Sequence, residues 1–177
     1  MLQNLPDLIY PLRFARSRRN LRGRVALARM HRLRPLLAAE RGYVEVNLRF
    51  GADHWGRLGV RGEARAELHL TCQRCLGVML CRVESDIRLN MIFSEDQMDR
   101  PTEYLSPGFE PLVITDDETG MILSDLIEDE LILMLPSVPR HPDGACKIAG
   151  GYLGGESTQN EQNKSFAALE GLMEYRG

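Results

Sequence analysis

Residues 58–75 read LGVRGEARAELHLTCQRC, and this stretch decides the fold. Apolar or small side chains alternate with polar ones as far as Cys72, which is the period of a β-strand with one buried face. A second alternating segment follows to residue 93, and its change of phase at 80–81 predicts a β-bulge. Residues 57–93 are therefore predicted to form one long antiparallel hairpin, with Cys72-Gln73-Arg74-Cys75 at its tip.

Shorter patterns predict the other elements. They are an edge strand within 10–25, a short helix within 26–40 that ends or kinks at Pro35, strands at 44–50 and 111–114, and a main helix at 121–135. On the main helix, the leucines and Ile127 are expected to face the core, and Asp125, Glu128 and Asp129 to face outward. The predicted class is α+β, with an antiparallel sheet and its hairpin (about 57–93) packed against one main helix (about 121–135).

Composition divides the chain into two parts. Residues 1–146 are predicted to form a single domain, because apolar periodicity continues through them. Residues 147–177 begin with a stretch rich in Gly, Ser, Gln and Asn, which predicts a flexible C-terminal tail ending in a short amphipathic segment.

The overall composition is that of a soluble protein. The chain has 177 residues, of which 44% are hydrophobic and 27% charged. No apolar run is long enough to span a bilayer, and the N-terminus lacks the apolar stretch of a secretory signal. We therefore expect a cytoplasmic protein without a membrane partner.

The cysteines suggest a metal site or free thiols. A C-x-x-C pair at a hairpin tip supplies two zinc ligands, Cys72 and Cys75, and His141 and Cys146 could complete a tetrahedral set. Alternatively, the cysteines are reduced and unliganded, with Cys72 as the last inward residue of its strand. A thiol redox pair is disfavoured, because that chemistry favours C-x-x-C at a helix start in a βαβ unit. A structural zinc ion is the one cofactor hypothesis, and Cys81 is expected to be a buried thiol.

The basic residues are concentrated at the start of the chain, and almost all of them are arginines. Arginine suits phosphate recognition, and Tyr10 and Phe14 could stack on unpaired bases. The alternatives are a solvated face, or contact with the acid-rich segment between Glu84 and Glu130. The candidate RNA-binding residues are Arg13, Arg16, Arg18, Arg19, Arg22, Arg24 and, at the hairpin tip, Arg74.

No pattern predicts an enzyme. Glu128, Asp129 and Glu130 are neighbours on a helix, so they diverge by about 100° each and cannot converge on one substrate atom. The sequence has no Gly-rich phosphate loop and no nucleophile elbow. We expect no catalytic residues and no small-molecule substrate.

Taken together, the motifs resemble the bacterial YceD family. The resemblance covers about residues 10–146 and a short final segment, and an extra Cys81 and an especially Arg-rich start depart from the family pattern. It implies a cytosolic protein, without known catalytic activity, that supports large-subunit ribosomal RNA through its synthesis, processing or stability. The positions that carry the resemblance are Cys72, Arg74, Cys75, Glu128, Asp129, Glu130, Pro136, His141 and Cys146.

Two functional hypotheses follow. The first is a non-enzymatic ribosome-biogenesis factor whose partner is large-subunit ribosomal RNA, its precursor or a ribosomal assembly protein, with RNA contacting the Arg-rich N-terminal face. The second is a zinc-stabilised protein–protein adaptor, whose acidic helix would meet basic ribosomal proteins.

Overall fold

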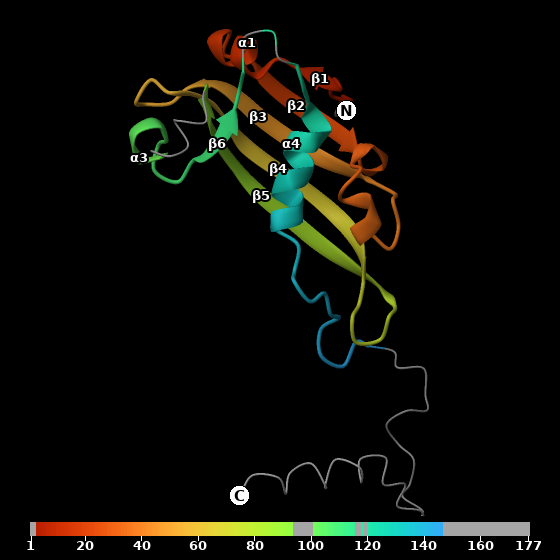
Figure 1. Cartoon of the computed structure of the whole chain (residues 1–177). Helices are drawn as coiled ribbons and strands as arrows, with labels where there is room; N and C mark the ends of the chain where they lie inside the picture. Colours follow the sequence, from red (N-terminus) through yellow and green to blue (C-terminus); the bar gives the residue numbers. More distant parts are fainter. Residues whose placement is uncertain (1–2, 94–100, 116–117, 119, 147–177) are drawn as a thin grey trace, which may run out of the picture. The chain divides into compact units, whose positions relative to one another are not determined.

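The structure is a computed structural model that describes residues 3–93, 101–115, 118 and 120–146. It contains a five-stranded sheet and one main helix, α4, which lies across one face of the sheet (Figure 1). This confirms the α+β class. The elements are β1 (Leu8–Ile9), α1 (Pro11–Arg16), β2 (Asn20–Ala26), the 3-10 turns η1 (Leu27–Arg29) and η2 (Arg34–Leu36), β3 (Tyr43–Ala52), β4 (Leu58–Thr71), β5 (Val78–Ile92), α3 (Pro101–Tyr104), β6 (Glu110–Val113), β7 (Met121–Ile122) and α4 (Leu123–Leu133).

The main sheet has the strand order β2-β3-β4-β5-β6. Its first four strands pair antiparallel, and β6 pairs parallel to β5. One face of the sheet packs against α4, and buried residues of both elements, such as Leu48, Ile87 and Ile127, belong to one hydrophobic cluster. The opposite face, called the open face below, carries the charged residues that alternate with the core positions. Among the described residues, no helix is long and apolar enough to cross a membrane.

The predicted long hairpin is confirmed, but the prediction of a β-bulge within it is wrong. The pairing of β4 with β5 runs without interruption from Gly59↔Asn90 to Thr71↔Val78. The phase of the sequence pattern changes because Val78 and Leu80 are apolar although they lie on the open face, where both are exposed. The alternation of apolar and polar residues therefore changes phase at 80–81, while the backbone pairing of β4 with β5 stays continuous.

The two N-terminal predictions are only partly correct. Residues 11–16 form helix α1, with Pro11 at its first turn, and only residues 20–26 form the expected edge strand. Within 26–40 there is no α-helix, only the two 3-10 turns. The backbone N–H groups of Arg32 and Leu33 donate to the side chain of Glu128 instead of to helical carbonyls. Pro35 removes a further donor.

Helix α4 was predicted within two residues at each end, but one of its faces was misassigned. Glu128 was expected to point outward, and its side chain is only 1% exposed. One carboxylate oxygen accepts hydrogen bonds from the backbone of Arg32 at 3.1 Å and of Leu33 at 3.4 Å. The other accepts Nε of Arg32 at 2.7 Å. The acidic helix thus binds the Arg-rich segment at this point, as one of the sequence hypotheses proposed.

Two further expectations have different outcomes. Cys81 was expected to be buried and is only half-buried, because it lies near the hairpin tip beyond the end of α4. The flexible tail expected over 147–177 lies outside the described residues, so the division into one domain and a tail stays a prediction.

We expect substitution of the buried carboxylate to destabilise the fold. Glu128→Ala leaves two backbone donors and Nε of Arg32 without their acceptor, so the free energy of unfolding should fall by about 3 kcal/mol. The control is Asp129→Ala, which removes an acid that also pairs with Arg32 but is 56% exposed, and should cost under about 1 kcal/mol. Urea unfolding measures both, and equal losses would contradict the role assigned to Glu128.

Candidate metal centre and basic surfaces

The tip of the β4–β5 hairpin is joined to the loop that follows α4. Cys72 N–H donates to the carbonyl of Gly77 at 2.9 Å, and Leu76 N–H donates to the carbonyl of Cys72 at 2.8 Å. Leu76 adopts a positive φ of 57°, which closes this turn. Gln73 N–H donates to the carbonyl of Pro139 at 2.8 Å, and this bond holds the loop against the tip.

These contacts bring together the four residues that the sequence predicted as metal ligands. Their ligand atoms all lie within 4.8 Å of one another. The sulfur atoms of Cys72 and Cys146 are 3.7 Å apart. His141 Nδ1 lies 3.4 Å from the sulfur of Cys75 and 3.6 Å from that of Cys146. Residues separated by about 70 positions in the chain therefore form one Cys₃His cluster.

The spacing of the cluster fits a tetrahedral zinc ion. Zn–S bonds of about 2.3 Å and Zn–N bonds of about 2.0 Å place two sulfurs about 3.8 Å apart, and a sulfur and a nitrogen about 3.6 Å apart. The three distances above match these edges within a few tenths of an ångström. Cys72, Cys75, His141 and Cys146 could thus hold one such metal ion with little movement.

Neighbouring groups hold the candidate ligands in position. His141 Nε2 lies 3.2 Å from the carbonyl of Val78, so a proton on Nε2 leaves Nδ1 free to face the sulfurs. The backbone N–H of His141 donates to the sulfur of Cys72 at 3.4 Å. Arg74 Nε donates to the sulfur of Cys146 at 2.9 Å, and the same guanidinium pairs with Asp143. Arg74, one of the predicted RNA ligands, therefore has protein partners already.

The electrostatics favour charged forms of Cys72 and His141. Burial raises the pKa of the Cys72 thiol, but hydrogen bonds from His141 and from the backbone of Cys75 outweigh it and lower this pKa to about 5. The sulfurs of Cys72 and Cys146 raise the pKa of His141. For Cys75 the balance is reversed: the Gly77 N–H lowers its pKa, yet burial and the two other sulfurs raise it overall. A thiolate at Cys72 is the form in which cysteine binds metals.

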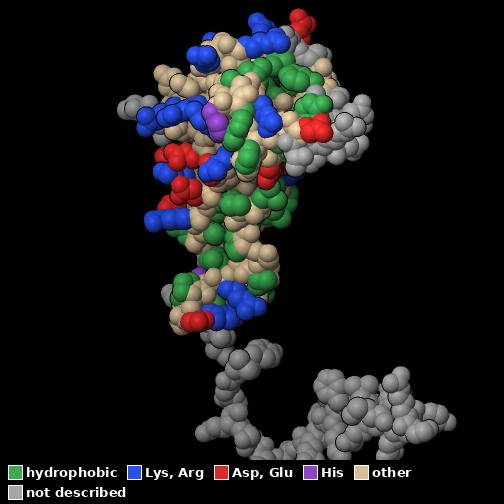
Figure 2. All heavy atoms as spheres, turned by 90° about the vertical axis from the view of Figure 1, so that its left-hand side faces the viewer, with side chains coloured by type: hydrophobic (Ala, Val, Ile, Leu, Met, Phe, Trp, Pro, Cys, Tyr) green, Lys and Arg blue, Asp and Glu red, His purple; other side chains and the backbone are tan. Residues whose placement is uncertain are grey.

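The predicted N-terminal arginines come from more than one element. Arg13 and Arg16 are on α1, whereas Arg22 and Arg24 are on β2. Figure 2 shows basic side chains gathered toward the end that carries α1, with a smaller group at the hairpin tip. The rings expected to stack on bases are covered by the protein's own cations, since Arg13 lies over Tyr10.

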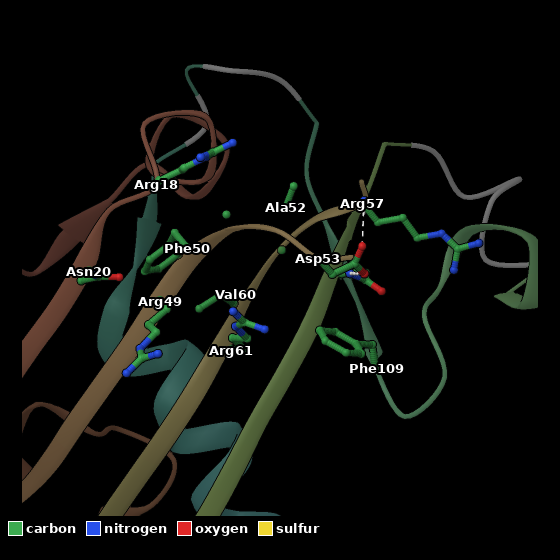
Figure 3. A pocket seen from close by; sticks show the side chains of 13 residues that line it. Arg18, Asn20, Arg49, Phe50, Ala52, Asp53, Arg57, Val60, Arg61 and Phe109 are labelled. Atoms are coloured by element: carbon green, nitrogen blue, oxygen red, sulfur yellow. Dashed lines mark hydrogen bonds between the residues drawn. The ribbon is translucent and has the colours of Figure 1, made fainter. Parts of the chain in front are cut away.

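A second basic feature was missed by sequence reasoning. A hollow of about 420 Å³ lies on the open face, and three exposed arginines that line it are Arg18, Arg49 and Arg61 (Figure 3). The alternating pattern places Arg49 and Arg61 on the polar side of their strands, but nothing local reveals that the strands align them. Strand register is the signal that was lacking.

The fold and the cluster define a class: small α+β proteins in which a Cys/His group ties a β-hairpin to the loop after the main helix. The comparisons with known proteins give its family. The family model described as "Large ribosomal RNA subunit accumulation protein YceD" matches residues 60–173. The chain belongs to the YceD family.

A curated relative extends the similarity to most of the chain. It is the large ribosomal RNA subunit accumulation protein YceD of Haemophilus influenzae, 29% identical over 146 residues that cover 82% of this chain and 80% of the relative. No solved structure matches the chain. The resemblance inferred from the motifs is confirmed.

Proposed function

We propose that this protein promotes the accumulation of large-subunit ribosomal RNA as a non-enzymatic assembly factor in the cytoplasm, by contacting RNA directly. The match of residues 60–173 to the YceD family carries the proposal. The relative from Haemophilus influenzae bears the same description, and it aligns over most of both chains.

The exposed arginines support contact with RNA. Arg18 and Arg22 are exposed, and their side chains make no hydrogen bond or ion pair with any other residue in the described part of the chain. A guanidinium that has no protein acceptor can bind a phosphate without first breaking an internal contact.

The Cys₃His cluster supports a structural zinc ion and not a catalytic one. Catalytic zinc sites keep one coordination position open, whereas structural sites use four protein ligands. Here four side chains converge, and the ring of His141 is further fixed by the carbonyl of Val78. A bound ion would hold the loop after α4 against the hairpin tip.

A protein–protein adaptor is the second candidate, because the hairpin tip carries exposed apolar side chains. Leu76, Val78 and Leu80 are 77%, 58% and 52% exposed. Such a group favours contact with another protein over contact with RNA phosphates. The acidic helix supports this candidate less than expected, since Glu128 is buried and bound to Arg32.

Depletion of the protein should lower the ratio of large-subunit to small-subunit ribosomal RNA, and restored expression of the wild-type chain should return it. The ratio is measured by electrophoresis of total RNA, with sucrose gradients to follow the subunits. Ultraviolet crosslinking of the tagged full-length protein in cells should recover fragments of large-subunit precursor RNA.

An unchanged ratio after depletion would contradict the proposed function. A changed ratio, with crosslinks only to ribosomal proteins, would favour the adaptor. A control protein with Leu76→Ser and Leu80→Ser should keep its RNA crosslinks if RNA is the direct partner, because those side chains lie at the apolar hairpin tip.

We expect the protein purified without chelators to contain about one zinc ion per chain. Cys72→Ser should remove it, lower the Tm by about 5–10 °C and speed tryptic cleavage after the exposed Arg140, because the loop is released from the tip. The matched control is Cys81→Ser, which alters the one cysteine outside the cluster. Metal analysis of both variants tests this prediction, and a zinc content unaffected by Cys72→Ser would exclude the site.

A further inference from the structure

Three arginines are aligned across adjacent strands of the open face. Arg49 on β3 pairs with Arg61 on β4, and Arg61 pairs with Arg88 on β5. Residues directly opposite in antiparallel strands have Cβ atoms about 5 Å apart, and like charges in that position destabilise the sheet. The register therefore concentrates positive charge in one row, which packing of the sheet does not require.

The other arginines of β4 and β5 on this face differ from Arg49 and Arg61 in one respect. Arg65 pairs with Glu63 and Glu84, and Arg82 pairs with Glu67. Arg88, at one end of the row, pairs with Asp86. By contrast, the side chains of Arg49 and Arg61 make no hydrogen bond or ion pair with any described residue.

Arg49 and Arg61, whose side chains have no ion-pair partner among the described residues, line the hollow of Figure 3. Arg18 and Arg57 also line it. Among the described residues, Asp53 supplies the one carboxylate in the wall of the hollow, and both of its oxygens already accept hydrogen bonds. Its oxygens accept the backbone N–H groups of Trp55 and Arg57 at 2.9 Å each, as well as the side chains of Asn90 and Ser106.

These bonds determine the charge of the hollow. Burial raises the pKa of Asp53, but the hydrogen bond from Ser106 and the backbone bonds outweigh it and leave the pKa lowered. Asp53 therefore stays ionised and satisfied within the protein. Arg18, Arg49 and Arg61 against one carboxylate leave the hollow with an excess of positive charge, whereas the guanidinium of Arg57 points away and donates to the carbonyl of Glu103 (Figure 3).

An exposed aromatic side chain lies in the turn that Asp53 orders. Trp55 is in the turn between β3 and β4, directly after Asp53 and His54, and its side chain is 51% exposed. Asp53 orders this turn by accepting the Trp55 N–H. Exposed tryptophans next to basic grooves are typical platforms for the stacking of unpaired bases.

We propose that this hollow binds the phosphodiester backbone of single-stranded RNA, with Arg49 and Arg61 contacting phosphates and Trp55 stacking on a base. The proposal rests on the proposed function and names the site for it. The fork of a guanidinium matches phosphate oxygens, and the aligned row presents two free guanidinium groups side by side. An acidic protein segment would use the same charges but would gain nothing from the exposed ring.

The test compares two double variants of the full-length protein by fluorescence anisotropy with a labelled single-stranded RNA of about 12 nucleotides. The variant Arg49→Gln/Arg61→Gln removes the two guanidinium groups that have no ion-pair partner among the described residues. The matched control, Arg65→Gln/Arg82→Gln, removes the same charge from β4 and β5 on the same face, where acids already neutralise it. Circular dichroism verifies that both variants are folded.

We expect the Kd of Arg49→Gln/Arg61→Gln to rise at least about tenfold, and that of the control to change less than about threefold. The slope of log K against log salt should fall by about 1.4 for the first variant, or about 0.7 for each phosphate lost. Equal losses in both variants, or none in the first, would overturn the proposal. So would binding of polyglutamate as tight as that of RNA, which would indicate an acidic protein partner.

Trp55 supplies a second readout, because it is the one tryptophan of the chain. Saturating RNA should quench its fluorescence, and Arg49→Gln/Arg61→Gln should lose the quenching at the same RNA concentration. Emission that stays unchanged when wild-type protein is saturated with RNA would place the RNA elsewhere and reject the site.

The site and the function can fail separately. If the wild-type protein restores ribosomal RNA levels in depleted cells and Arg49→Gln/Arg61→Gln does so with undiminished RNA affinity, the site is rejected and the function stands. If depletion leaves those levels unchanged, the function is rejected, whatever the hollow binds.

Discussion

The contact between α4 and the segment after β2 depends on one buried carboxylate. Glu128 enters the interior with a charge, and this is tolerated because Arg32 and two backbone N–H groups satisfy it. The same bonds turn the segment after β2 into short 3-10 turns, so that Met30 and Leu33 reach the core. One interaction thereby sets the position of the helix and the path of the N-terminal segment.

At the other end of the molecule, the hairpin extends beyond the helix. Its tip lacks the cover of α4, and apolar residues there, such as Leu80, remain exposed. The Cys₃His cluster lies where the hydrophobic core has ended. A small unit that cannot be held by apolar burial is the usual place for a structural metal, since metal ligation replaces the missing core.

Between these two ends, ion pairs are distributed unevenly over the open face of the sheet. Three of its arginines, Arg65, Arg82 and Arg88, are neutralised by acids on the same or the neighbouring strand, which is the common arrangement on a solvated sheet. Arg49 and Arg61 depart from it, and their row lies beside a turn whose geometry Asp53 maintains. Two arginines that have no acidic partner among the described residues thus line one hollow.

Local periodicity was sufficient to predict the hairpin, α4 and even the four cluster residues, because strand alternation, helical spacing and ligand chemistry are written in short stretches of chain. It failed wherever a distant partner decided the outcome. The carboxylate of Glu128 is buried because Arg32, 96 positions away, comes to it. The row of Arg49 and Arg61 exists only because β3 and β4 pair in one register. Register and long-range pairing arise from the packing of the whole chain, so they cannot be read from any one segment.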